Sequence, residues 1–193
     1  LLVELGQNPT AYSDTITMLE NIGHFLDREV QHKFNFYKEK HKTNVEITEM
    51  IAGNVDVAKV LGESSKRWDG GYAIAGLLGH GDAFVVRDPW GIRPAYYYHD
   101  DEVAVVTSER PAIQTGFNVD ADQIKEVDPG YAIIIRKNGK ITLEEVRKPQ
   151  QRKACSFERI YFSRGNDTGS TDRAQPQRSS ADRAVPASSG TII

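Results

Sequence analysis

Apolar residues recur every three or four positions through the first third of the chain, which is the period of an amphipathic helix. Ser13 or Asp14 can cap the beginning of this helix. Gly23 and the polar residues around Gln31 interrupt the pattern, so the sequence predicts a break that divides the helix into two. The apolar positions are Ile16, Leu19, Ile22, Leu26, Val30, Phe34 and Tyr37.

Two shorter helices are predicted next. Thr43 and Glu46 have the spacing of a capping box, in which each side chain accepts a hydrogen bond from the other residue's backbone. Asn54 is predicted to begin the following helix. The apolar residues of these two helices are Ile47, Met50 and Ile51, then Val57, Val60 and Leu61.

Beyond Asp69 the pattern changes from helices to strands. Residues 72–79 form a nearly continuous apolar run, which predicts a strand buried on both faces. The turn at His80 and Gly81 joins this run to residues 82–88, so the two segments are predicted to form a hairpin.

A second hairpin is predicted around Asn138-Gly139, the strongest short hairpin signal in the chain. It joins strands at 131–137 and 140–146, and Ser108 is predicted to cap a short helix over 110–114. The remaining predicted strands are residues 95–100, 102–108 and 154–162.

Helices that precede a mostly antiparallel set of strands indicate the α+β class. The strand runs are too apolar for a sheet with one solvated face. Two stacked sheets with helices outside would bury both faces of such strands, so we expect a layered arrangement.

Composition and charge exclude several classes of function. The net charge is −3, with acidic and basic residues interspersed, so nothing indicates nucleic acid or a membrane as partner. The single cysteine, Cys155, excludes an internal disulfide framework, and the five histidines lack the spacing of a metal site. We therefore predict a cytoplasmic protein with no metal site, no membrane contact and no nucleic-acid partner in this chain.

The last segment, residues 168–193, is rich in Ser, Ala, Arg, Asp and Pro and has no aromatic residue. It lacks both hydrophobic periods, so it is predicted to be disordered or to lie outside the domain. The chain begins at Leu1 without an initiator Met, and both ends read as cut. One hypothesis for the abrupt change in composition is a change of reading frame or an incomplete gene.

The segment RDPWGIRP, residues 87–94, is the most informative string in the chain. Pro89 fixes one backbone φ angle and Gly91 permits a positive one, which is typical of a turn. Arg87 and Arg93 offer planar forks of donors that can bind loop carbonyls or carboxylates. From these residues alone, a structural turn between strands is the favoured interpretation.

With its surroundings, residues 87–94 resemble the RDPxGIRP pattern of the class II glutamine amidotransferases. Residues 155–164, CSFERIYFSR, are similar to the CxFExxYFxRxxS stretch of the amidophosphoribosyltransferases. Residues 128–135, DPGYAIII, are similar to the PGxAxxI strand that precedes this stretch in the family. The resemblance extends over residues 1–167, which we expect to be a partial class II glutamine amidotransferase domain. The residues that carry the turn motif are Arg87, Asp88, Gly91 and Arg93.

This resemblance implies an N-terminal-nucleophile hydrolase type four-layer αββα sandwich, here incomplete. In that family an N-terminal cysteine attacks the side-chain amide of glutamine, with its own α-amino group as general base. Ammonia then passes inside the protein to phosphoribosyl pyrophosphate and gives 5-phosphoribosylamine, the first step of de novo purine synthesis. The chain lies downstream of that cysteine, so it contains no assignable catalytic residue and is expected to be inactive alone.

The resemblance also implies a substrate-binding residue. Residues 12–15, YSDT, are similar to the family's SD(S/T)E segment, in which the Asp receives the α-amino group of glutamine. This implies that role for Asp14, although Ile16 stands where the family has Glu. From the residues alone, a helix cap at Ser13 and Asp14 is the favoured interpretation.

Phe157 and Tyr161 match positions that line the family's ammonia passage. Their spacing of four puts both on one face of a strand, and a plain core or domain-interface role is the alternative. Cys155 is internal and is therefore not the nucleophile; we expect a buried, inert thiol. One thiol cannot hold the iron–sulfur cluster that the matching Cys ligates in some members.

The resemblance implies no cofactor in this chain, and Mg²⁺ with phosphoribosyl pyrophosphate in the full-length enzyme. It implies glutamine as substrate and a homo-oligomer. No VxxDDSIVRGTT-like pyrophosphate loop occurs in the sequence. Two alternatives stay open: a different class II amidotransferase, against which residues 155–164 argue, and a non-catalytic binding module of the same fold.

Overall fold

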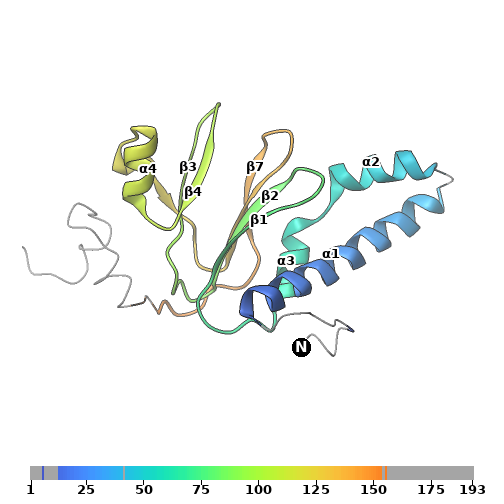
Figure 1. Ribbon diagram of the computed structural model, residues 1–193, viewed down its shortest axis with the longest axis horizontal. Helices are drawn as coiled ribbons and strands as arrows, with labels where there is room; N and C mark the ends of the chain where they lie inside the picture. The colour runs from blue at the N-terminus through green and yellow to red at the C-terminus, as the bar shows by residue number, and fades with distance from the viewer. Residues whose placement is uncertain (1–5, 7–12, 41, 154, 156–193) are drawn as a thin grey trace, which may run out of the picture. The chain divides into compact units, whose positions relative to one another are not determined.

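The computed structural model describes residue 6, residues 13–40 and 42–153, and residue 155 (Figure 1). These residues lie in a unit that runs to Cys155. The predicted boundary at residue 167 lies outside the described residues. The described elements are, in order, α1 Asp14–Lys38, α2 Asn44–Asn54, α3 Val57–Ser65, β1 Ala73–Leu77, β2 Ala83–Arg87, β3 Tyr96–His99, β4 Ala104–Thr107, α4 Arg110–Phe117, the 3-10 turn η2 Ala121–Gln123, β5 Lys125–Glu126, β6 Tyr131–Ile135 and β7 Ile141–Glu145.

Helix α1 is continuous over 25 residues, so the predicted break near Gly23 is wrong. A glycine inside a helix costs about 1 kcal/mol, which the tertiary contacts of the neighbouring turns offset. Gln31 donates its side-chain amide to Asn35 at 2.9 Å, an i,i+4 bond that supports the helix where a break was expected. Ser13 caps the helix as predicted.

The short helices have one confirmed boundary and one that is wrong. Thr43 and Glu46 form the predicted capping box at the beginning of α2. Asn54 does not begin α3; it ends α2 and donates its side-chain amide to the carbonyl of Met50 at 2.8 Å. The carboxylate of Asp56 caps α3 instead.

Four antiparallel strands form the first sheet, in the order β1-β2-β6-β7. Both predicted hairpins are present, since β1 pairs with β2 and β6 pairs with β7. Alternate residues of the two central strands face opposite sides. One set, which includes Phe84 and Ile134, packs under helices α1 to α3, and the other, which includes Val85 and Ile133, packs toward the second sheet.

Strand β1 is less buried than predicted. Ala73, Ala75 and Leu77 are exposed, and the exposed fraction of Leu77 is 77%. Among the described strands, β1 stands at the end of its sheet and has one neighbour. The prediction of burial on both faces is therefore wrong, because an apolar run does not reveal whether anything covers it.

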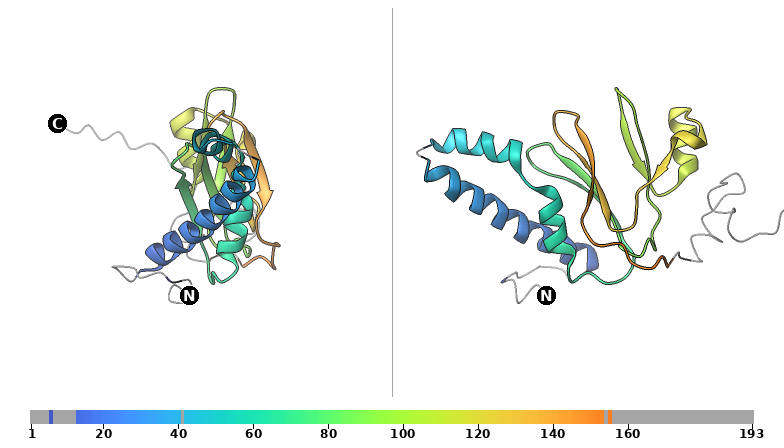
Figure 2. Two further views of the ribbon diagram at one scale, coloured as in Figure 1. Left: turned by 90° about the vertical axis from the view of Figure 1, so that its right-hand side faces the viewer. Right: turned by 180° about the vertical axis from the view of Figure 1, so that it is seen from behind.

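The second sheet has the order β4-β3-β5. Tyr97 points into the core between the sheets, where it joins Ala95 and Val127. On the opposite face of this sheet Arg110 of α4 lies over the ring of Tyr96, at 5.0 Å from its centroid. The described residues thus form four layers, helices, sheet, sheet and helix, which confirms the α+β class (Figures 1 and 2).

Helix α4 starts one residue later than a Ser108 cap would require. Its N-cap residue is Glu109, and no side chain caps it, so the predicted cap is wrong. Pro111 lies in the first turn, where the missing N–H costs nothing. None of the described helices combines the length and the hydropathy of a membrane span.

Candidate functional site

The RDPWGIRP segment is a closed turn built around Asp88. One carboxylate oxygen of Asp88 accepts the backbone N–H groups of Trp90 and Ile92, and the other accepts that of Arg93, each at 3.0 Å. Asp88 has no exposed surface. A buried carboxylate that receives three backbone donors fixes the path of the loop.

Arg87 holds the same turn from the other side. Its side chain is 1% exposed and donates to the carbonyl of Arg93 at 2.7 Å and to that of Val127 at 2.5 Å. It also donates to the carboxylate of Glu126 at 2.8 Å. Such a fork of planar donors suits several carbonyls at once. Through these bonds Arg87 ties the loop to its neighbours.

Two glycines let other segments approach this turn closely. Gly91 has φ +61°, and a Cβ there would lie 2.9 Å from Pro129. Gly130 has φ +78°, and a Cβ there would overlap the backbone carbonyl of Arg147. Within the described residues this end of the sheet is thus filled by protein atoms, and the interpretation as a structural turn agrees with it.

Asp14 lies in the first turn of α1 and is exposed. The neighbouring Ser13 accepts the backbone N–H of Ile16 at 3.2 Å, so the cap is provided by Ser13 and leaves the Asp14 carboxylate available. The substrate-binding role of Asp14 stays a prediction. Phe157 and Tyr161 lie outside the described residues.

Cys155 is partly exposed, so the prediction of a buried thiol is wrong. The residues before it, 150–153, are polar and exposed, which leaves Cys155 at the end of a solvated segment. Most of the predicted strand 154–162 lies outside the described residues.

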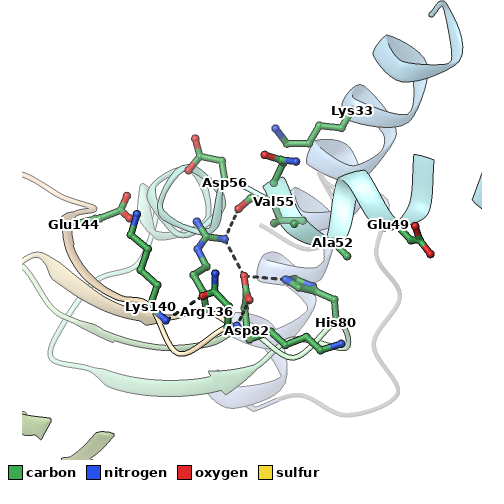
Figure 3. Close-up of a pocket in the computed structure, with 14 residues that line it drawn as sticks. Lys33, Glu49, Ala52, Val55, Asp56, His80, Asp82, Arg136, Lys140 and Glu144 are labelled. Atoms are coloured by element: carbon green, nitrogen blue, oxygen red, sulfur yellow. Dashed lines mark hydrogen bonds and ion pairs between the residues drawn. The ribbon is translucent and has the colours of Figure 1, made fainter. Parts of the chain in front are cut away.

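A polar cleft of about 820 Å³ lies at the other end of the first sheet (Figure 3). It is bordered by the end of α2, the β1–β2 turn and the β6–β7 hairpin. Its lining includes side chains that are widely separated in the sequence. The charged and histidine side chains in the lining are Lys33, Glu49, Asp56, His80, Asp82, Arg136, Lys137, Lys140 and Glu144.

Asp82 forms the floor of this cleft and is 3% exposed. Arg136 donates one amino group both to Asp82 and to the carbonyl of Val55, each at 2.8 Å. Lys137 donates its backbone N–H to Asp82 at 2.8 Å. His80 Nε2 lies 3.0 Å from the carboxylate but off the angle of a good hydrogen bond, so this contact is an ion pair only when the imidazole is protonated.

The partners of Asp82 determine its charge state. Burial raises the pKa of the Asp82 carboxyl, but the bond from Lys137, the His80 ring and the Arg136 guanidinium together outweigh burial and hold the pKa below its ordinary value. Asp82 is therefore ionised at neutral pH. Sequence reasoning missed this group because Asp82 and Arg136 are brought together only by the pairing of β2 with β6.

A smaller hollow of about 280 Å³ lies between α1 and α3. Its most buried carboxylate, Glu29, is held by Lys59 at 2.8 Å and by Lys33 at 3.2 Å. Among the described residues no group of three His, Cys, Asp or Glu side chains gathers as metal ligands would.

The sequence is similar to curated amidophosphoribosyltransferases. It is 33% identical over 110 residues to the protein of Archaeoglobus fulgidus, a match that covers 56% of this chain and 23% of that protein. It is 35% identical over 102 residues to the Escherichia coli protein, a match that covers 49% of this chain and 19% of that protein. It is 37% identical over 83 residues to the chloroplastic amidophosphoribosyltransferase 3 of Arabidopsis thaliana, a match that covers 42% of this chain and 15% of that protein. The chain thus spans a quarter or less of these relatives, and no family model matches it.

Two solved structures are also similar. One is glutamine phosphoribosylpyrophosphate amidotransferase from B. subtilis complexed with ADP and GMP, at 23% identity and a TM-score of 0.46, covering 72% of this chain and 31% of that one. The other is described as the allosteric regulatory enzyme of purine biosynthesis, at 24% identity and a TM-score of 0.48, covering 69% and 30%. Because both TM-scores are below 0.5, the evidence for a family comes from the sequence relatives and not from these two structures.

Proposed function

We propose that this chain is part of an amidophosphoribosyltransferase, contributing to a glutaminase domain of the N-terminal-nucleophile hydrolase type. The complete enzyme hydrolyses glutamine and passes the ammonia to phosphoribosyl pyrophosphate, which gives 5-phosphoribosylamine. The observation that carries the proposal is the sequence similarity to relatives of that name over about half of the chain. The four layers and the Asp88 turn are compatible with it.

In this proposal the described residues build the scaffold and one substrate contact. The Asp88 turn fixes the end of β2, and Asp14 receives the α-amino group of glutamine through a charge-assisted hydrogen bond. Phe157 and Tyr161 line the ammonia passage, which needs the second domain to form. Cys155 takes no part in glutamine hydrolysis.

The finer features of the proposal concern the complete enzyme. Mg²⁺ accompanies phosphoribosyl pyrophosphate in the second domain, the subunits form a homo-oligomer, and the enzyme is cytoplasmic. The relatives described above are all amidophosphoribosyltransferases, which favours this enzyme over another class II amidotransferase.

A chimaeric enzyme tests the proposal. Residues 13–153 would replace the matching segment of the Escherichia coli relative, and phosphoribosylamine formation would be measured with glutamine and, separately, with ammonia. We expect glutamine-dependent activity in the chimaera. In Asp14→Asn the KM for glutamine is expected to rise by roughly 30-fold or more, because a desolvated ammonium loses its counter-charge. Ammonia-dependent activity should not change.

Asp27→Asn is the matched control, since Asp27 is an exposed carboxylate on the same helix. It should leave the KM for glutamine as it is. A chimaera that folds and uses ammonia but not glutamine would contradict the proposal for the scaffold. An unchanged KM in Asp14→Asn would contradict the role of Asp14 alone.

The chain by itself is expected to hydrolyse no glutamine, because its single cysteine is internal and has no α-amino group beside it to act as base. A glutaminase assay on the purified 193-residue chain checks this. Cys155→Ser is the matched variant: turnover that vanishes with this change would show that the partly exposed thiol is a nucleophile and would overturn our interpretation of Cys155.

A further inference from the structure

The cleft above Asp82 has the construction of a ligand site, and the glutamine reaction proposed above makes no use of it. A buried carboxylate on the floor bonds Arg136 and lies 3.0 Å from His80 Nε2, so these two side chains stand next to each other (Figure 3). Both are only partly buried, with 26% and 18% of their side chains exposed. Both side chains are positioned by contact with Asp82 and are exposed toward the cleft. Side chains positioned in this way are suited to contact a ligand.

Arg136 retains donors that the protein does not use. One of its two terminal amino groups makes the contacts with Asp82 and Val55. Its second amino group and its Nε–H have no hydrogen bond to any described residue. The guanidinium is therefore held in place by one arm, and its other donors can form a bidentate pair with an oxyanion.

The carboxylates of the cleft equal its Lys and Arg side chains in number, four of each, so net charge alone does not favour an anion. Three carboxylates are engaged: Asp82 by Arg136, Asp56 by the N-terminus of α3, and Glu144 by the Thr142 hydroxyl. Glu49, on the rim, is the carboxylate without a hydrogen bond or ion pair to a described residue.

Of the lysines, Lys33 is paired with Glu29 at 3.2 Å. The amino groups of Lys137 and Lys140, on the β6–β7 hairpin beside Arg136, have no such partner within the described residues, and both side chains are exposed. Arg136, Lys137 and Lys140 thus place unused N–H donors on one wall, and this placement, rather than an excess of positive charge, is what suits an oxyanion.

We propose that this cleft binds the oxyanion group, a phosphate ester or a carboxylate, of a small metabolite, with Arg136, Lys137 and Lys140 as its direct contacts. Asp82 acts as a positioning residue, because it orients Arg136 without facing the ligand. The proposal is independent of the proposed function, since it concerns the opposite end of β2 from the Asp88 turn.

Nuclear magnetic resonance titrations of the complete chain test this proposal. Inorganic phosphate is the probe in one arm and succinate in the other, at constant ionic strength so that screening is equal. We expect saturable shifts in the backbone amides of His80, Asp82 and residues 136–140, and none in residues 90–93. The arm that saturates at the lower concentration identifies the oxyanion; absence of saturation in both arms would overturn the proposal.

Lys140→Gln and Lys66→Gln form a matched pair of variants. Each removes one positive charge, but Lys66 lies outside the cleft and pairs with Glu63 at 2.6 Å. The cleft variant is expected to weaken binding about 3- to 10-fold, and the control less than 2-fold. Equal weakening in both variants would mean non-specific attraction and would also overturn the proposal.

Arg136→Lys gives a second, independent readout. The charge is retained and the planar fork is lost, so binding should weaken at least 10-fold, provided that Asp82 remains paired. The shift of the Lys137 amide, which is bonded to Asp82, reports whether the floor of the cleft is preserved. Undiminished binding with the floor preserved would show that Arg136 is not a contact.

Discussion

The two ends of strand β2 each have a buried aspartate, and the two aspartates have different tasks. Asp88, at the end of the strand, receives three backbone N–H groups and has no exposed surface. Asp82, just before the strand and roughly 20 Å away, receives one backbone N–H and otherwise contacts the side chains of Arg136 and His80. The first is enclosed by protein and the second lies under a cleft.

The difference shows that the partners of a buried carboxylate indicate its role. Backbone donors are fixed by the chain path, so a carboxylate that collects them shapes a loop. Side-chain donors retain further hydrogen-bonding capacity, so a carboxylate that orients them can prepare a surface for a ligand. Burial alone does not separate the two, since Asp88 and Asp82 are both less than 4% exposed.

The largest loss of stability is expected from a substitution in the Asp88 turn, which we call the closed end of β2. Asp88→Ala leaves the N–H groups of Trp90, Ile92 and Arg93 without their acceptor and should lower the free energy of unfolding by about 4 kcal/mol. Urea denaturation of the chain measures it. Asp101→Ala, at an exposed carboxylate, is the control and should change stability by less than about 0.5 kcal/mol. A loss as small as the control's would contradict the role assigned to Asp88.

A pair of glycines sharpens the same contrast. Gly130 at the closed end and Gly139 at the cleft end have φ of +78° and +83°, so alanine meets similar backbone strain at both. A Cβ at Gly130 would overlap the carbonyl of Arg147, whereas at Gly139 nothing lies within 4 Å.

Gly139→Ala is therefore expected to cost about 1 kcal/mol, the strain alone. Gly130→Ala should cost about 3 kcal/mol, strain plus displacement of a packed backbone. Thermal and urea unfolding of both variants provide the comparison. Equal losses would mean that the closed end yields as easily as an open hairpin.

The same contrast explains what the sequence could predict. The caps at Ser13 and Thr43 were predictable because each cap joins residues three positions apart in the chain, and the hairpin was predictable because its turn residues, Asn138 and Gly139, are adjacent. The fold class followed from the periods of apolar residues. The turn at Asp88 was recognisable for the same reason of locality.

Features that depend on long-range pairing were not predictable. Asp82 and Arg136 are 54 residues apart, and only the register of β2 with β6 brings them together. The exposure of β1 depends on which elements cover its inner face, and the continuity of α1 through Gly23 depends on packing. A single sequence contains the residues for these outcomes but not the neighbours that determine them.

A smaller loss of stability than at Asp88 is expected from Asp82, at the cleft end, where pH separates the two aspartates further. The pKa of Asp82 is lowered in the folded chain, so its ionised form adds stability that is complete above the unfolded value of about 3.9 and is lost as the pH falls through the lower, folded value. Asp82→Asn should therefore cost about 2 kcal/mol at pH 7, the value of hydrogen bonds to a charged group. The gap between wild type and variant should narrow as the pH falls below about 4.

Urea unfolding between neutral and acid pH measures this gap, with Asp101→Asn as the control that should show no gap at any pH. A gap that stays constant into acid would mean that the charge of Asp82 contributes nothing and that its hydrogen bonds alone hold Arg136. In that case Arg136 would keep its position in the Asn variant. Anion binding would then survive the change, and the two ends of β2 would differ in exposure but not in electrostatics.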